Sequence, residues 1–209
     1  MIGFGTIGYI FENQIKDKEF VLNNVSLAMK KRDGNKENVL TKRFLNIDAY
    51  LKITCGDSNG MRTSIVVTSK LLEYLELPES LLWTAAYNNM RDSFFITDIS
   101  EVLHQDYLTN QLYVLTTKNN YDGASAIMFV DEFVRFCEHY NLDSCFIIPS
   151  STMELLLVPN NERTSISTSE MAIMVREINS SCVEESIQLP PAIYKFCLAE
   201  KSITIVAEA

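Results

Sequence analysis

Apolar residues recur along this chain with strand-like and helix-like spacing, and short polar turns separate the segments. Residues 45–55 alternate as a half-buried strand does. The turn cluster at 56–60 follows, and the β-branched run at 63–68 then predicts the returning strand. We therefore expect a β-hairpin here.

Two short helices are predicted directly after this hairpin. Ser69 is placed to cap the first, and Pro78 to open the second. The apolar faces comprise Leu71, Leu72 and Leu75 in the first helix, and Leu82, Ala85 and Ala86 in the second, where Asn89 could share the face.

A second hairpin followed by a helix is predicted further along. Residues 112–117 indicate a strand, 118–123 a polar turn, and 124–130 a returning strand. Asp131 is the expected N-cap of the helix that follows. Its predicted apolar face comprises Phe133, Phe136, Cys137 and Tyr140.

The last third of the chain adds two hairpins and one helix. Segments 145–149 and 154–158 predict a strand pair, and 192–198 with 203–207 predict another. Between the pairs, Ser167 and Glu170 form a capping box. The predicted buried stripe of that helix comprises Met171, Met174, Val175 and Ile178.

This order of elements predicts an α+β fold, with helices packed on an antiparallel or mixed sheet of hairpins. The repeated hairpin-plus-helix pattern suggests an internal duplication. Since nothing resembles a flexible linker, we expect one compact domain over 1–209, with 1–108 and 109–209 as potential halves.

Charge, cysteine usage and hydropathy indicate which partners and which cellular compartment to expect. Residues 16–43 carry eight basic and four acidic side chains, a local +4, so the rest of the −9 chain carries −13. An acidic body disfavours direct nucleic-acid binding. Five cysteines without a C-x-x-C pair indicate reduced, buried thiols. No apolar run approaches the ~20 residues of a membrane span. We expect a cytoplasmic protein that needs no cofactor or metal.

Motifs that could carry chemistry are weak. Gly3, Gly5 and Gly8 match G-x-G-x-x-G, but no strand precedes them, as a dinucleotide site requires. The two histidines, His104 and His139, have the character of surface or cap residues.

A serine-type hydrolase is an unfavoured alternative. It would use Ser150 or Ser151 with one of the histidines, yet the G-x-S-x-G elbow is absent. Turn chemistry explains these serines, and also Asp122-Gly123, where the glycine would permit a positive φ. Among carboxylates, Asp131, Glu132 and Glu154 could meet in space, but the sequence does not pair them.

A set of short motifs lies at 112–116, 123–124, 148–151 with Glu154, 157–159 and 174–179. Together they are similar to those of an uncharacterised bacterial family, known only as containing a domain of unknown function. The likeness is strongest over 110–205 and weaker over 44–103, and full-length relatives usually carry a further N-terminal segment. The resemblance implies a cytoplasmic protein of gut anaerobes or their mobile elements. It implies no activity, cofactor or catalytic residue.

These observations favour a non-enzymatic regulator or inhibitor that binds another protein, in a bacterial, phage or mobile-element context. A nucleic-acid-processing enzyme is one such partner, because an acidic surface can stand in for phosphate. The alternative is a small-ligand sensor with a pocket near 121–123 and 149–154. The candidate interaction surface comprises Tyr121, Asp122, Gly123, Ser150, Ser151 and Glu154.

Overall fold

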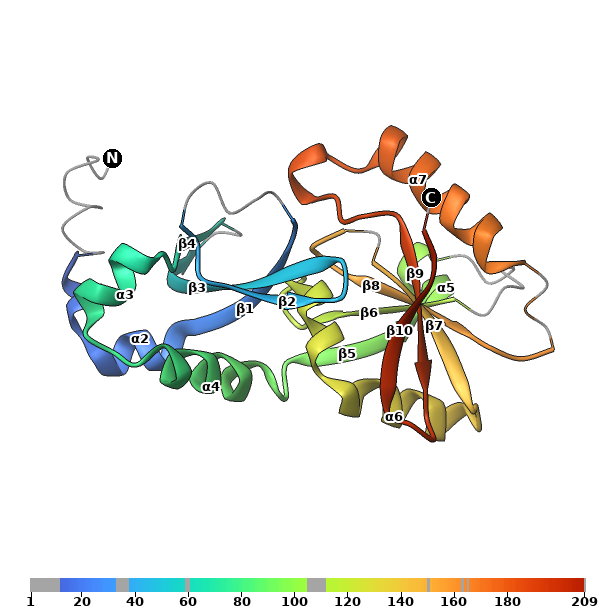
Figure 1. Cartoon of the computed structure of the whole chain (residues 1–209), viewed down its shortest axis with the longest axis horizontal. Helices are drawn as coiled ribbons and strands as arrows, with labels where there is room; N and C mark the ends of the chain where they lie inside the picture. The colour runs from blue at the N-terminus through green and yellow to red at the C-terminus, as the bar shows by residue number, and fades with distance from the viewer. Residues whose placement is uncertain are drawn as a thin grey trace. The chain divides into compact units, whose positions relative to one another are not determined.

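The computed structural model describes residues 12–32, 38–58, 61–104, 112–149, 151–162, 164 and 166–208. The chain divides into two units, which Figure 1 shows with their helices and strands. Unit 1 comprises Met1–Ala28, Asp33–Lys42 and Ala49–Asp92, and unit 2 comprises Met29–Arg32, Arg43–Asp48 and Ser93–Ala209. The glycine motif at Gly3, Gly5 and Gly8 lies outside the described residues.

The N-terminal elements include a four-stranded sheet and the helices α2, α3 and α4. Its order is β1-β3-β2, and β4 pairs with β3 in antiparallel register, which confirms the first predicted hairpin. The elements are α2 (Lys18–Asn24), β1 (Val25–Lys31), β2 (Thr41–Phe44), β3 (Ile47–Ser58), β4 (Met61–Val66), α3 (Ser69–Leu75) and α4 (Glu79–Met90).

Both predicted helices of this region form, with small corrections. Thr68, not Ser69, is the N-cap of α3, and its hydroxyl accepts a hydrogen bond from the Leu71 amide. Pro78 precedes α4 as predicted, and Leu82 and Ala86 are buried. Asn89 is exposed, although its side-chain amide donates to the backbone carbonyls of residues 22 and 25.

Unit 2 contains a six-stranded sheet in the order β10-β9-β7-β8-β6-β5. Every adjacent pair is antiparallel, so the predicted α+β fold is confirmed. Its elements are β5 (Phe94–Asp98), α5 (Ile99–Leu103), β6 (Tyr113–Thr117), η1 (Gly123–Met128), α6 (Val130–Tyr140), β7 (Ser144–Ile148), β8 (Leu155–Pro159), α7 (Thr168–Cys182), η2 (Glu185–Ile187), β9 (Ala192–Cys197) and β10 (Ser202–Glu208).

Helices α6 and α7 cover opposite faces of this sheet, as Figure 1 shows. On β9, Phe196 contacts the α6 residue Phe133, with ring centroids 5.6 Å apart. Ile193 lies three positions earlier, so it is on the other face, and it belongs to the cluster under α7. Strand β7 is buried along its whole length because both of its faces are covered. The predicted pairs β7–β8 and β9–β10 are confirmed.

The predicted returning strand at 124–130 is wrong. These residues form the 3₁₀ helix η1 and the start of α6, and β6 pairs instead with β5 and β8. The apolar composition of this segment suits a buried helical turn as well as a strand, and the Ser125 hydroxyl holds the turn by donating to the Asp122 carbonyl at 2.6 Å. The second hairpin of the proposed duplication is therefore missing.

The start of α6 also differs from the prediction. Phe129 occupies the N-cap position, and Asp131 lies exposed in the first turn. A carboxylate there still interacts favourably with the helix dipole. The expectation of one domain with halves at 1–108 and 109–209 stays a prediction.

Candidate functional site

Two of the predicted site segments meet in a loop junction, formed by residues 121–124 and 151–154. The Gly123 amide donates to the Met153 carbonyl at 3.0 Å, and the Ala124 amide donates to the Thr152 carbonyl at 3.3 Å. Backbone hydrogen bonds therefore hold together residues that lie about thirty positions apart in the chain.

Gly123 is required in this loop junction because there is no room for a side chain. A Cβ atom here would lie 2.2 Å from the Met153 carbonyl oxygen and 2.8 Å from Thr116 Cα. The positive φ angles expected of the glycine belong instead to Asn120, at 56°, and Asp122, at 58°. The prediction of a turn is right, but the role of its glycine is close packing, not a left-handed backbone.

Ser151 is buried in the same loop junction and has a structural partner. Its hydroxyl oxygen accepts a hydrogen bond from the Met153 amide at 3.1 Å, and its backbone bridges to Gln188. His104 and His139 are exposed, and no hydrogen bond joins either to Ser151 within the described ranges. Ser150 lies outside the described residues. The geometry thus gives Ser151 the turn role that its sequence context predicts.

Only part of the predicted interaction surface is open to solvent. Asp122, Gly123 and Ser151 are buried, whereas Tyr121 and Glu154 are partly exposed. Partial burial raises the pKa of the Glu154 carboxyl. The use of this loop junction for protein binding stays a prediction. Of the predicted surface residues that the structure describes, Tyr121 and Glu154 are the ones exposed enough to make contacts.

The remaining candidates for acid–base or metal chemistry are dispersed. Glu132 is buried and its carboxylate accepts a hydrogen bond from the Arg135 guanidinium, whereas Asp131 is exposed. Over the described residues, no group of three or more histidine, cysteine, aspartate or glutamate side chains could hold a metal ion. Among the helices of the described residues, none is both long and apolar enough to span a membrane.

The cysteines remain free thiols and differ in burial. Cys55, Cys137 and Cys145 are buried, Cys197 is intermediate and Cys182 is exposed. Burial raises the pKa of the Cys55 thiol. The expectation of buried cysteines therefore holds for three of the five, and Cys182, at the C-terminal end of α7, is its clear exception.

Helix α7 begins as the sequence predicts. The Ser167 hydroxyl accepts a hydrogen bond from the Glu170 amide at 3.3 Å, and the Glu170 carboxylate accepts one from the Ser167 amide at 2.9 Å. This reciprocal capping box satisfies two backbone donors that a helix start would otherwise leave unpaired.

The face that α7 turns to the sheet differs from the predicted stripe. Met171 and Val175 are buried as expected, but Ala172 and Asn179 complete the buried face in place of Met174 and Ile178. The cluster beneath the helix comprises Phe146, Ile148, Met171, Ala172, Val175 and Ile193.

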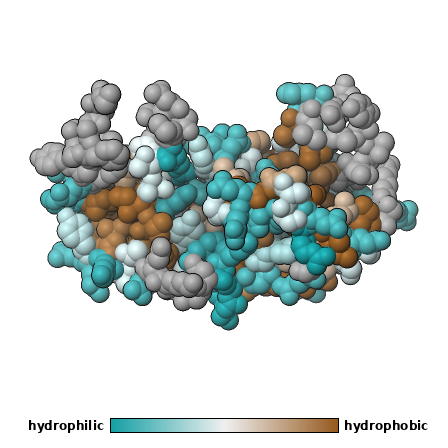
Figure 2. Space-filling model, turned by 90° about the horizontal axis from the view of Figure 1, so that it is seen from above, coloured by the Kyte–Doolittle hydropathy of each residue, from teal (hydrophilic) through white to brown (hydrophobic). Residues whose placement is uncertain are grey.

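The opposite side of α7 exposes large apolar side chains. The outer face of α7 is defined by Ile166, Glu170, Ile173, Met174 and Ile178. The exposed fractions are 39% for Ile166, 43% for Ile173, 47% for Met174 and 49% for Ile178. Seen from above in Figure 2, hydrophobic residues gather over the part of unit 2 that contains α7.

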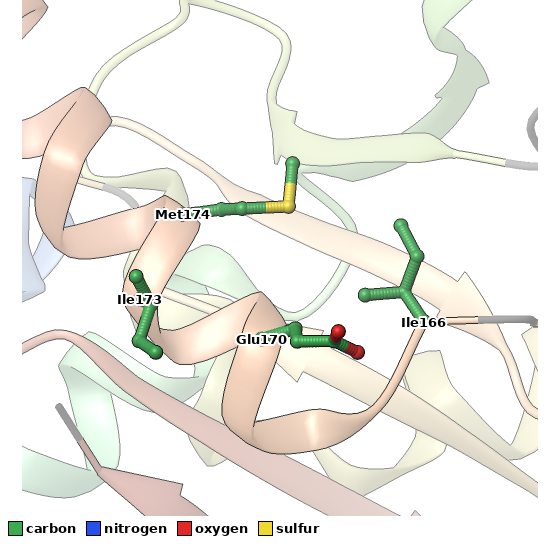
Figure 3. A pocket seen from close by; sticks show the side chains of 4 residues that line it. All are labelled: Ile166, Glu170, Ile173 and Met174. Atoms are coloured by element: carbon green, nitrogen blue, oxygen red, sulfur yellow. The ribbon is translucent and has the colours of Figure 1, made fainter.

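The outer face contains a shallow hollow of about 380 Å³, lined by Ile166, Glu170, Ile173 and Met174. In Figure 3, Met174 and Ile166 extend over the same space beside the Glu170 carboxylate, while Ile173 projects from another side of the helix. None of the residues that line this hollow belongs to the loop junction. The sequence signal for it is the uninterrupted apolar run at 171–175, which wraps around a helix and cannot be buried on one side.

Comparison with known proteins gives a family but no function. No curated protein and no solved structure matches the chain. A sequence model described as "Family of unknown function (DUF5688)" matches residues 12–197, which covers both units and begins well before the region where the motifs are most similar. This chain therefore belongs to the DUF5688 family.

Proposed function

We propose that this protein is a non-enzymatic regulator or inhibitor that binds another protein, and that the outer face of α7 is its contact surface. The observation that carries the proposal is the exposure of Ile173, Met174 and Ile178 on a helix whose inner face is already packed. A cluster of exposed large apolar residues on a water-soluble surface is typical of a protein-binding site.

The character of the hollow supports a protein partner over a small ligand. Ligand pockets enclose most of their ligand and present several convergent polar groups. This hollow is shallow, and among the described residues that line it, Glu170 is the polar one. The Glu170 carboxylate accepts hydrogen bonds from the Ser167 amide and hydroxyl, so it is already in use.

The serine chemistry considered above has little support. Ser151 is buried and hydrogen-bonded within a turn, and the two histidines are exposed at other positions. A nucleophile needs a base within hydrogen-bond reach, about 2.6–3.2 Å. A non-enzymatic role fits these positions better.

Photo-crosslinking in cells of the native host tests the proposal. We expect p-benzoylphenylalanine in place of Ile178 to capture one discrete protein. The matched control carries the same amino acid in place of Leu81, which is 40% exposed on α4. Equal capture from both positions, or from neither, would contradict the proposed contact surface.

The proposal also includes a candidate class of partner protein. A nucleic-acid-processing enzyme is one candidate, because the overall charge of −9 would be attracted to a basic nucleic-acid-binding surface. If the crosslinked partner is such an enzyme, its binding should weaken with salt, since interactions between exposed charges are screened. Binding that is unchanged between low and high salt would count against this candidate.

A further inference from the structure

We infer that the outer face of α7 binds a basic amphipathic helix of a partner protein. The inference rests on the proposed function and adds the kind of segment that the face recognises. Three features of the surface support it: the spacing of its apolar residues, the charges between them, and the closed backbone of α7.

The apolar residues suit the side chains of a second helix. Ile173, Met174 and Ile178 lie on α7, and Ile166 directly precedes Ser167, the N-cap residue of this helix. A helix that presents apolar residues at i, i+3 or i+4, and i+7 can place them along such a surface. The hollow beside Met174 can receive an apolar side chain, and the flexible methionine can adapt to its shape.

A helix is favoured over an extended segment because of backbone hydrogen bonding. The backbone of α7 is engaged in its own helix and offers no sheet edge to a visiting strand. An extended segment laid on an apolar helix face would lose water from its amides without gaining partners. A helix brings its backbone hydrogen bonds with it.

The charges on and around the outer face favour a basic partner. Glu170 and Glu177 are spaced three or four residues from Ile173 and Met174, so they lie between the exposed apolar residues. Within 166–188, the exposed charged residues are Glu170, Arg176, Glu177, Glu184 and Glu185, a net charge of −3.

This charge also weighs against the other occupants. Two copies of the chain would bring two faces of −3 together, and like charges across an interface are unfavourable. Anionic lipid and nucleic-acid phosphate would be repelled for the same reason. Lysine or arginine beside the apolar residues of a helix would complement Glu170 and Glu177.

Selection from a displayed library of 16-residue helix-forming peptides tests the inference. The full chain is the bait, and both the apolar and the charged positions of the peptides are randomised. We expect the enriched peptides to carry apolar residues at helical spacing with an excess of lysine and arginine. An enriched peptide, labelled with fluorescein, then serves as the probe for fluorescence anisotropy.

Three variants locate the binding. We expect Met174→Asp with Ile178→Asp to weaken binding of the selected peptide at least tenfold, the loss typical of a central interface residue. Leu81→Asp, the matched control on α4, should leave binding unchanged. Glu170→Gln with Glu177→Gln should weaken binding by about 2- to 30-fold, the equivalent of two exposed ion pairs. Glutamine at position 170 preserves the capping box.

Each other result would overturn the inference in a recognisable way. Enriched peptides that are neutral or acidic, yet depend on Met174, would refute the basic helix and leave the proposed contact surface in place. A dimer in sedimentation that the Met174→Asp, Ile178→Asp variant abolishes would mean that a second copy occupies the face. Failure to enrich any peptide sensitive to this variant would refute the inference, while the crosslinking test would still decide the proposed function.

Discussion

Helices α6 and α7 cover opposite faces of the same sheet, but they use their apolar residues differently. In α6, Phe133, Phe136 and Cys137 are all buried, and exposed polar residues such as Glu138 and His139 occupy the other side. In α7, the buried residues are smaller or more flexible, and Ile173, Met174 and Ile178 remain exposed. Tyr140, the last residue of α6, is 38% exposed, but its ring contacts that of Phe136, so α6 leaves less apolar surface exposed than α7 does.

Aromatic contacts make the α6 side of the core compact. The Phe133 and Phe196 ring centroids are 5.6 Å apart, and those of Tyr113 and Phe136 are 5.1 Å apart, with an edge-on arrangement. Burial also raises the pKa of the Tyr113 hydroxyl. We conclude that α6 contributes mainly to stability, while the outer face of α7 is available for binding.

The largest effect is expected for Phe133→Ala in α6. Phe133 is fully buried, so its truncation removes transfer free energy and leaves a cavity. We expect the free energy of unfolding to fall by about 3–5 kcal/mol. Urea unfolding followed by circular dichroism measures this loss, because the signal includes the helix α6 itself, whereas the single tryptophan, Trp83, belongs to unit 1. A loss below about 1 kcal/mol would mean that α6 packs no more tightly than the outer face of α7.

Gly123→Ala should have the next largest effect. The new methyl group would meet the Met153 carbonyl oxygen and Thr116 Cα, which are backbone atoms that cannot rotate away. We expect a loss of about 1–3 kcal/mol, as for other overpacked sites. Gly56→Ala is the matched control, since no atom of the described residues, its chain neighbours aside, lies within 4 Å of the position that its new methyl group would take. Equal effects of the two substitutions in urea unfolding would contradict the close packing of the loop junction.

A smaller effect is expected from removing the α7 cap. Ser167→Ala eliminates the hydroxyl that accepts from the Glu170 amide, and we expect a loss of about 1 kcal/mol. Glu170→Gln, which keeps the reciprocal hydrogen bond, should cost less. Thermal unfolding of both variants provides the comparison, and an equal loss in the two would argue against the capping box.

The smallest effect concerns Glu154 and depends on pH. Burial favours the neutral form of the Glu154 carboxyl and so raises its pKa in the folded protein. The contribution of the neutral carboxyl to stability is therefore complete below the pKa of the unfolded chain, near 4.5. It is lost as the pH rises through the raised pKa of the folded protein. Glu154→Gln should therefore be the more stable protein at neutral pH, by up to about 0.5 kcal/mol. Urea unfolding at several pH values measures the gap. A gap that shrinks as pH rises would show that the carboxylate is stabilised instead.

The parts of the fold that could be predicted depend on local sequence. The hairpins β3–β4, β7–β8 and β9–β10 each join neighbouring segments through a short connection, and the Ser167–Glu170 capping box is a local signal. The pairing of β9 with β7 and of β6 with β8 joins separate segments, so turn chemistry could not reveal it.

The candidate site was predictable only in part. Composition marked residues 118–123 and 150–152 as turns. It could not show that Gly123 is packed against the Met153 carbonyl, because that contact is made through the fold. The helical spacing of Met174 and Ile178 identified apolar positions on α7. It could not say that the sheet would cover Met171 and Val175 and leave these two exposed.

The central claim is that the outer face of α7 is not part of the core. The free energy of unfolding of the triple variant Ile173→Ser, Met174→Ser, Ile178→Ser tests it most directly. The account predicts a change within about 1 kcal/mol, because substitutions at exposed positions rarely matter for stability. A loss of about 4 kcal/mol or more would show that these side chains are buried by the chain itself, and would leave no surface for a partner.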